Sequence, residues 1–323
     1  MKIEEIVIAF SSKKVLVVGD AMIDRYILGK INRVSPEAPV NIVDINKSED
    51  RLGGAANVAV NIKSLGAYPI LCSVIGDCEK KDLFYTLMKK NNLTTEGIFI
   101  QKDRINTVKT RIIANNKHQI RFDEEDKSDI NIQEEFLEFI KDLIVNIDVI
   151  ILQDYNKGVL TTNVIKKMLS HAKNYRIPIV VDPKEKNFHL FQGCSLFKPN
   201  LRELGLGMGI NIDVDNLDSL KEITENFRCK IKADAILLTL SEKGICIKSS
   251  SSFHHIPAFD RDIIDITGAG DTVLAMAALC LTLKISNEDL AFLSCLAGGL
   301  ACEQLGAGSI NINKFITSVN DIS

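Results

Sequence analysis

Seven residues, from Asp265 to Asp271 (D-I-T-G-A-G-D), combine a tight turn with a carboxylate, and an apolar segment follows them. Gly268 and Gly270 have no Cβ, so the backbone can turn sharply and expose its N–H groups. A helix beginning at about Gly270 would direct its free N–H groups and its positive dipole end at this turn, which makes an anion site. Asp271 beside that site is a candidate general base, as phosphoryl transfer to a hydroxyl requires. The alternative is that Asp271 only caps the helix.

A second group of candidates follows the apolar run Lys14–Gly19. Such a run is typical of a buried parallel strand, which would deliver Asp20 to the edge of a sheet where ligands bind. Asp24 follows four residues later, on what we expect to be a turn and a second strand. Both carboxylates are candidates for binding a hydroxyl-rich substrate.

The stretch Arg51–Asn57 (R-L-G-G-A-A-N) is expected to open a helix. Gly53 and Gly54 permit close backbone approach, and Asn57 falls on the first turn. A substrate rich in hydroxyl groups could be held there by backbone amides and by the Asn57 side chain. Tight packing of the helix on the sheet is the alternative explanation for the two glycines.

Asn200 and Glu203 are three residues apart, hence on one face of a first helical turn. There Asn200 could donate to a phosphate oxygen, and Glu203 could hold the water shell of Mg²⁺. The same spacing is a capping box, which is the alternative. The chain has neither G-x-x-x-x-G-K-[ST] nor the glycine loop, H-R-D and D-F-G of protein kinases, so neither of those phosphate sites is expected.

Three cations alternate with apolar residues in two short β-type runs and could share one face: Lys109, Arg111 and Arg121. Together they could bind a phosphate group of the substrate. Ordinary solvated charges on a strand are an equally good interpretation.

Alternating strand and helix patterns must position these residues, and they predict an α/β fold with a mostly parallel sheet. Four expected strands end in polar residues on the same edge: Gln153–Gly158, Asp182–Lys184, Lys198–Asn200 and Leu240–Gly244. Four such ends at one edge are typical of an active-site rim. Short strands at about 23–45 and 98–122 are expected to form a lid, and residues 1–323 to form one domain.

Composition limits the function classes. A net charge of −3 and the absence of Trp give no reason to expect nucleic acid or an anionic membrane as a partner. The longest apolar run is too short to span a bilayer, and the N-terminal sequence is not a signal peptide. None of the eight cysteines forms a C-x-x-C pair, so free thiols in a reducing cytoplasm are expected.

Three motifs in this order resemble the signatures of the ribokinase-like (PfkB) carbohydrate kinases: G-G-A-A-N at Gly53–Asn57, N-L-R-E at Asn200–Glu203 and D-I-T-G-A-G-D at Asp265–Asp271. The resemblance covers essentially the whole chain. It implies a three-layer α/β/α sandwich with a small β-sheet lid, ATP and Mg²⁺ as cofactors, and a homodimer formed through the lid. A monovalent-cation requirement is left open.

The resemblance also implies roles for individual residues. Asp271 would be the catalytic base, with an anion hole formed by the amides of Gly268, Ala269 and Gly270. Sugar hydroxyls would be bound by Asp20, Asp24, Gly53, Gly54 and Asn57. Asn200 and Glu203 would organise Mg²⁺–ATP, Glu203 through water, and the nucleotide side would be completed by Thr239, Ser241, Gly244 and Thr267.

Within that family, further segments resemble the kinases of D-glycero-D-manno-heptose 7-phosphate, which form the 1,7-bisphosphate on the way to ADP-heptose for lipopolysaccharide. These segments are Gly19–Tyr26, Arg33–Val40, Gly53–Ala59, Asp182–Lys184 and Lys198–Leu201. The candidates for binding the 7-phosphate are Lys109, Arg111, Arg121 and Lys184, with Arg33 as a further one. Because no H-x-G-H follows, only the kinase step is expected of this chain.

Two departures from the family pattern concern the nucleotide side. Leu240 stands where an Arg is common, and Ala297-Gly298-Gly299 is smaller than expected on the adenine side. Two other functions stay open: another sugar or nucleoside kinase of the same fold, and a non-catalytic nucleotide or sugar-phosphate sensor on a kinase scaffold.

Overall fold

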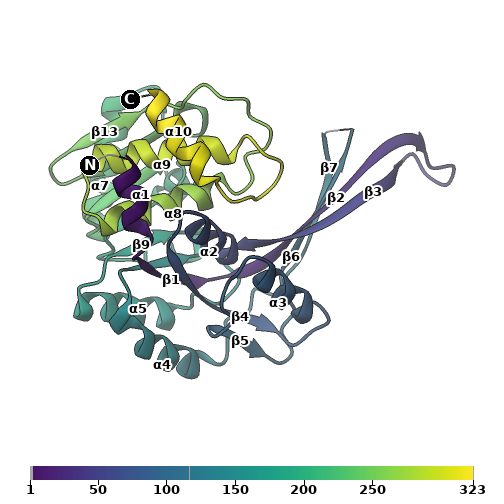
Figure 1. Ribbon diagram of the computed structural model, residues 1–323, viewed down its shortest axis with the longest axis horizontal. Coiled ribbons are helices and arrows are strands. Elements are labelled where there is room, and N and C mark those ends of the chain that lie inside the picture. Colours follow the sequence, from purple (N-terminus) through teal and green to yellow (C-terminus); the bar gives the residue numbers. More distant parts are fainter. Residues whose placement is uncertain (1–2, 116, 323) are drawn as a thin grey trace.

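A computed structural model describes residues 3–115 and 117–322 of the chain (Figure 1). The main sheet has nine strands in the order β13-β12-β11-β10-β9-β8-β1-β4-β5, and within it β1 (Lys14–Gly19) pairs in parallel with β4 and β8. The other strands are β4 (Tyr68–Gly76), β5 (Ile98–Gln101), β8 (Val149–Gln153), β9 (Ile179–Asp182), β10 (Leu196–Phe197), β11 (Ala235–Thr239), β12 (Ile245–Ser249) and β13 (Phe253–Ile256). Only β12 and β13 run antiparallel to their neighbours.

Helices cover both faces of this sheet, which confirms the three-layer α/β/α prediction. On one face lie α1 (Ile3–Phe10), α2 (Ala55–Ser64), α3 (Lys81–Lys90), α8 (Ala269–Thr282), α9 (Asn287–Ala301) and α10 (Ile312–Ile322). On the other lie α4 (Gln133–Leu143), α5 (Thr162–Tyr175), α6 (Leu201–Met208) and α7 (Leu217–Ile231). Alternate residues of β1 explain why both faces need cover: Val15 and Val17 enter one core, Leu16 and Val18 the other.

The lid is a separate four-stranded sheet that projects from the body as a long arm (Figure 1). Its strands, in the spatial order β3-β2-β6-β7, are β3 (Asn41–Gly54), β2 (Ala21–Val34), β6 (Val108–Ala114) and β7 (Lys117–Glu124). The polar turn expected between β6 and β7 includes Asn116, which lies outside the described residues.

Two details of the predicted lid are wrong. Ile98–Gln101 does not belong to it, because this strand pairs in parallel with β4 and buries Ile98 in the main core. The first lid segment is also not a series of short strands but one antiparallel pair of 14-residue strands. Pro36 and Pro39, which suggested interruptions, fall in the turn between β2 and β3, where no ladder hydrogen bond is lost.

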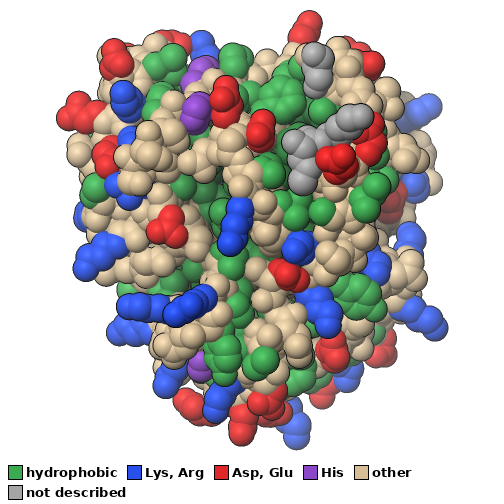
Figure 2. Space-filling view, turned by 60° about the vertical axis from the view of Figure 1, so that its left-hand side comes forward, with side chains coloured by type: hydrophobic (Ala, Val, Ile, Leu, Met, Phe, Trp, Pro, Cys, Tyr) green, Lys and Arg blue, Asp and Glu red, His purple; other side chains and the backbone are tan. Residues whose placement is uncertain are grey.

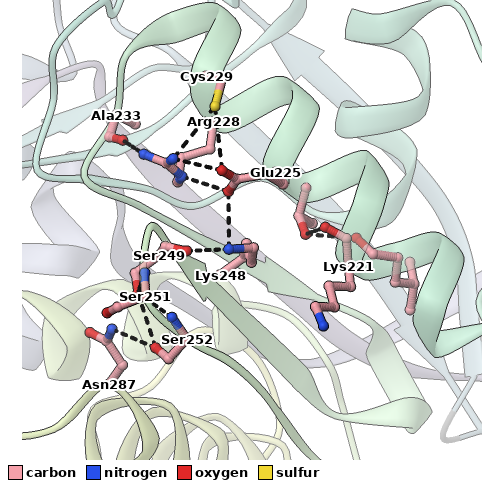
Figure 3. A network of polar contacts seen from close by, with 12 residues as sticks. Lys221, Glu225, Arg228, Cys229, Ala233, Lys248, Ser249, Ser251, Ser252 and Asn287 are labelled. Carbon is pink, nitrogen blue, oxygen red and sulfur yellow. Dashed lines mark hydrogen bonds and ion pairs between the residues drawn. The ribbon is translucent and has the colours of Figure 1, made fainter.

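An ion-pair network ties α7 to the antiparallel edge of the main sheet (Figure 3). The Glu225 carboxylate accepts two hydrogen bonds of 2.8 Å from the Arg228 guanidinium and lies 3.1 Å from Nζ of the buried Lys248 on β12. The hydrogen bonds from Arg228 are the main reason that the pKa of Glu225 falls to about 2. A carboxylate in this position lets a lysine be buried at the sheet edge without an uncompensated charge.

Figure 2 shows acidic and basic side chains interspersed over the side of the molecule that lies at the left of Figure 1. Mixed signs on this face agree with the small net charge of the sequence. Among the described residues, no helix has the length and apolar character needed to cross a membrane.

Candidate active site

The carboxyl ends of β1, β8, β9 and β10 meet at one edge of the main sheet, as their parallel pairing requires. The first turn of α8 lies against this edge. Asp271 contacts Gln153 at the end of β8, and a Cβ on Gly270 would lie 3.8 Å from Nζ of Lys198, which follows β10. Two of the polar strand ends predicted from the sequence, at Gln153 and Lys198, therefore lie against the N-terminus of α8.

The turn before α8 has the geometry of an anion site. Gly268 adopts a left-handed conformation with φ of 83°, and a Cβ there would lie 3.1 Å from Nδ2 of Asn57, so only glycine fits without strain. The helix begins at Ala269, one residue earlier than expected, and the Ala269 N–H donates a long 3.3 Å bond to Ile266. Within the described chain, the N–H groups of Gly268 and Gly270 have no hydrogen-bond partner.

Asp265 holds this turn in place. One carboxylate oxygen accepts from the N–H of Thr267 at 2.9 Å and from its hydroxyl at 2.7 Å, and the other accepts from the N–H of Gly306 at 2.9 Å. The hydroxyl of Thr267, a predicted nucleotide-side residue, is thus used to shape the turn. Asp265 had no predicted role, although it belongs to the motif.

The Asp271 carboxylate is 5% exposed and accepts three side-chain hydrogen bonds. Nδ2 of Asn57 lies 2.7 Å from one oxygen, and the Tyr155 hydroxyl and Nε2 of Gln153 lie 3.0 and 3.3 Å from the other. Burial raises the pKa of Asp271 to about 6, and the bond from Asn57 is the main opposing effect. The structure thus brings Asn57 to Asp271 and adds two residues that had no predicted role, Tyr155 and Gln153.

The segment that carries Tyr155 is fixed by Asp20. Both Asp20 oxygens are occupied by backbone N–H groups, from Tyr155 at 2.8 Å, Lys157 at 3.0 Å and Val159 at 3.0 Å. Burial still raises the pKa of this carboxylate, against those three bonds. Through these contacts Asp20 organises the loop after β8. The sequence had suggested a different role for it, the binding of sugar hydroxyls.

Gly53 and Asp24 lie opposite each other where the lid joins the body. A Cβ at Gly53 would lie 2.3 Å from Oδ2 of Asp24, so the missing side chain makes room for this carboxylate. Asp24 is buried and pairs with the Arg111 guanidinium. Gly54 starts α2 and passes close to the Asp20 carbonyl oxygen. Close packing, the alternative considered for the two glycines, is therefore present at both.

The lid cations share one face, as expected, because Arg111 lies directly opposite Arg121 in the β6–β7 ladder and is two residues from Lys109. Arg121 donates to Asp123 at 2.8 Å, and Arg111 forms its ion pair with Asp24. Lys109 has no carboxylate within ion-pair distance among the described residues, and its ammonium lies over the Tyr155 ring, 4.6 Å from the centroid. Burial lowers its pKa. Arg33 lies exposed near the outer end of β2.

The base of the lid is fastened to the loop after α9. The Tyr26 hydroxyl accepts from the N–H of Ala307 at 2.9 Å. The Arg51 guanidinium donates to the carbonyl oxygens of Leu305 at 2.6 Å and Ala307 at 3.1 Å. Because the N–H of Gly306, in the same loop, is bound by Asp265, the lid and the anion turn share one support.

Asn200 and Glu203 form the capping box at the start of α6, with bonds of 2.8 and 2.9 Å. The other Glu203 oxygen pairs with Lys184, whose ammonium also lies 3.7 Å from Asp182. Although burial opposes it, these carboxylates raise the pKa of Lys184. The structure thus brings Lys184 to the predicted metal–nucleotide rim, where its ammonium also lies 5.5 Å from the centroid of the Tyr155 ring that Lys109 of the lid contacts.

Lys198 is a cation that sequence reasoning did not single out. Its side chain is 4% exposed, its ammonium lies 3.0 Å from Asp182, and it adjoins Gly270 in the anion turn. Oδ1 of the buried Asp182 has no hydrogen-bond donor among the described residues. Carboxylates of this rim suit a hydrated Mg²⁺. The described residues contain no group of three or more His, Cys, Asp or Glu that could bind a metal by themselves.

Thr239 is brought beside Asn200 by a parallel bridge, and the turn Ser241–Lys243 followed by Gly244 continues from it. Leu240 is buried in the core, so its side chain does not reach the rim in place of the Arg that is common at this position. In the segment Ala297-Gly298-Gly299, which was predicted for the adenine side, a Cβ at Gly299 would lie 3.1 Å from Arg261, so the small residue makes room for that side chain. Arg261 is itself paired with Glu303 at 2.6 Å.

This architecture is shared with known kinases. The structure aligns with phosphofructokinase-2 from Escherichia coli in complex with potassium (TM-score 0.76, 16% identity, 95% of this chain and 99% of that one). It also aligns with ribokinase from Arabidopsis thaliana complexed with ribose and ATP (TM-score 0.73, 13% identity, 94% and 98%). At such identities the likeness defines the ribokinase-like fold.

The family follows from the sequence. A model of the pfkB family carbohydrate kinases matches residues 12–314, so the chain belongs to that family. Similar proteins include the bifunctional protein HldE of Citrifermentans bemidjiense (34% identity over 96% of this chain) and of Helicobacter pylori (36% over 95%). The chain spans 64% and 66% of the length of these relatives.

The raised pKa of Asp271 predicts a pH dependence. A base must be ionised, so kcat/KM for the acceptor should fall about tenfold per pH unit below about 6 and level off above it. The measurement is kcat/KM between pH 5 and 8 at constant ionic strength, with circular dichroism to check folding at each pH. A profile that stays flat down to pH 5 contradicts this prediction.

Proposed function

We propose that the chain transfers the γ-phosphoryl group of ATP to the anomeric hydroxyl of D-glycero-D-manno-heptose 7-phosphate. The product would be the 1,7-bisphosphate, used for ADP-heptose and the lipopolysaccharide core. One observation carries the kinase reaction: the buried carboxylate of Asp271 adjoins the free amides of Gly268 and Gly270. A base and an anion site in contact are what transfer to a hydroxyl needs.

In this mechanism Asp271 accepts the proton of the attacking hydroxyl. Asn57 and Gln153 orient its carboxylate, and burial keeps its pKa close enough to neutrality for proton transfer. The amides at the start of α8 stabilise the negative charge on the transferred phosphoryl group, since they are fixed before the reaction begins.

Lys198 would add a positive charge beside the same phosphoryl group, held in place by Asp182. The rim formed by Asp182, Asn200 and Glu203 would bind the hydrated Mg²⁺ of the nucleotide. When bound, Mg²⁺ supplies charge neutralisation on the β- and γ-phosphates. Lys184 balances the two carboxylates of this rim in the absence of nucleotide.

Three features support a phosphorylated acceptor. Lys109 on the lid faces the site without a carboxylate partner among the described residues, whereas Arg111 and Arg121 are already paired. The segments at Gly19–Tyr26 and Arg33–Val40 resemble those of heptose 7-phosphate kinases. The relatives named HldE cover nearly the whole chain at about 35% identity. Their description as bifunctional concerns the longer proteins, and the proposal covers the kinase reaction alone.

A substrate panel tests this assignment. With Mg²⁺–ATP, and with and without K⁺, we expect turnover of D-glycero-D-manno-heptose 7-phosphate to exceed that of ribose, fructose or fructose 6-phosphate. Asp271→Asn should lower kcat at least about 10³-fold while ATP still binds, because the base is lost. Preference for an unphosphorylated sugar would instead favour another kinase of the family, and no sugar-dependent ATP consumption at all would favour a sensor.

Lys109→Met tests the phosphate contact. Removing this cation should raise KM for the sugar phosphate about 10- to 100-fold and change kcat less, since the contact is remote from the reacting hydroxyl. Lys102→Met, at an exposed lysine after β5, is the matched control and should leave KM unchanged. An unchanged KM in Lys109→Met assigns the phosphate to other residues.

We further propose that the lid forms a homodimer. Ile120 and Phe122 are 58% and 47% exposed, and they share the outer face of the sheet with Ile27 and Ile112, opposite the face of Lys109. An open sheet with apolar side chains on its free face favours a second copy as cover.

Sedimentation velocity tests the dimer. The wild-type protein should sediment as a dimer at about 10 μM, and the double variant Ile120→Asp/Phe122→Asp should sediment as a monomer, because the variant places charges on the apolar face. A monomeric wild-type protein would contradict this proposal.

A further inference from the structure

Tyr155 is a residue of the site to which the proposed mechanism gives no task. Its hydroxyl donates to Oδ1 of Asp271 at 3.0 Å, a distance at which a base takes a proton from its substrate. A carboxylate has about four acceptor positions, two on each oxygen, and both positions on Oδ1 of Asp271 are taken by Gln153 and Tyr155, whereas Oδ2 accepts from Asn57. A sugar hydroxyl that approaches Oδ1 must therefore displace one of these two donors.

The three donors differ in how firmly they are held. Asn57, in α2, is 2% exposed, and Gln153, at the end of β8, is completely buried. Tyr155 stands on the following loop and is only partly buried. Asp20 fixes the backbone of this loop at residues 155, 157 and 159, so any departure of the phenol from Asp271 must come from rotation of the side chain.

We infer that Tyr155 is a gate: its hydroxyl occupies the place of the acceptor hydroxyl when no sugar is bound, and the sugar displaces it. This inference rests on the proposed kinase reaction, and its release step on a phosphorylated acceptor, but not on which phosphorylated sugar is used. While the Tyr155 hydroxyl and Gln153 fill Oδ1, water cannot use this oxygen as a base, so the gate suppresses hydrolysis of bound ATP. Burial and the neighbouring Asp271 hold the pKa of Tyr155 well above its ordinary value, so the phenol stays protonated and unreactive.

The lid provides a means of release. The ring of Tyr155 lies under two ammonium groups, Lys109 from the lid at 4.6 Å and Lys184 from the nucleotide rim at 5.5 Å. Such cation–π contacts are weaker than a pairing with a phosphate dianion. A phosphorylated acceptor that attracts Lys109 removes one support of the ring while its hydroxyl takes over the contact with Asp271.

Tyr155→Phe is the direct test. ATP hydrolysis without sugar should rise about tenfold or more, because water gains access to the base. The acid limb of kcat/KM should also move to higher pH: a hydroxyl that donates to a carboxylate favours its ionised form, so loss of the donor raises the pKa of Asp271. The other charged groups around this carboxylate, Asp182, Lys184 and Lys198, are unchanged in the variant.

The control is Tyr175→Phe, at a 44% exposed tyrosine that ends α5, and it should change neither quantity. If Tyr155→Phe leaves sugar-free hydrolysis at the wild-type rate, or lowers activity without moving the acid limb, the gate is excluded and Tyr155 only supports the site. Because hydrolysis is measured without any sugar, failure of the heptose assignment in the substrate panel does not affect this outcome.

A second variant covers the case in which Tyr155→Phe folds poorly. The chain contains no Trp, so Tyr155→Trp introduces a single reporter at the gate. Its fluorescence should change when the sugar phosphate is added and stay constant with ATP alone. A signal that responds to ATP alone, or not to the phosphorylated sugar at all, overturns the proposed displacement.

Discussion

A carboxylate that must stay ionised in a buried site is the constraint on which the rest of this structure depends. Charge inside a protein is costly unless hydrogen bonds and opposite charges compensate it. Asp271 receives that compensation from three elements, through Asn57 of α2, Gln153 of β8 and the dipole of its own helix α8. The order of strands in the main sheet brings these elements together at one edge.

Neighbouring carboxylates are compensated in the same way, and each serves more than one donor. Asp182 is shared by Lys184, Lys198 and Gln153, and Glu203 satisfies both Lys184 and the first turn of α6. Asp182 and Glu203 therefore both have cationic partners within the protein itself. Ligands enter such a site by exchanging partners, so binding need not leave a charge uncompensated at any stage.

Much of this was predictable from the sequence, because the signals were local. The turn at Asp265–Asp271 needed only glycine and the start of a helix, and the apolar run at Lys14–Gly19 identified a buried parallel strand. The contacts that give individual residues their tasks are not local. Asp20 binds amides more than 130 residues away, and Tyr155 reaches Asp271 across 116 residues. No spacing pattern reports such pairs: Tyr155 had been placed at the rim without a task, and Asp20 had been expected to bind sugar hydroxyls.

The lengths of lid strands were misjudged for a related reason. Prolines and polar residues between Tyr26 and Asp44 suggested interruption, but a two-stranded ribbon outside the core has no buried face to impose an alternating pattern. Strand Ile98–Gln101 was likewise too short to reveal whether β4 or the lid would pair with it. Pairing partners, rather than local preference, decided both cases.

The fastening of Tyr26 and Arg51 to the loop at 305–307 has a thermodynamic consequence. Gly306 of this loop is bound by Asp265, so a lid movement that breaks these contacts also releases a support of the anion turn. The free energy of opening the lid and that of ordering the turn are then coupled. Linkage makes this coupling reciprocal: whatever one ligand gains in affinity from the other, the other gains by the same factor.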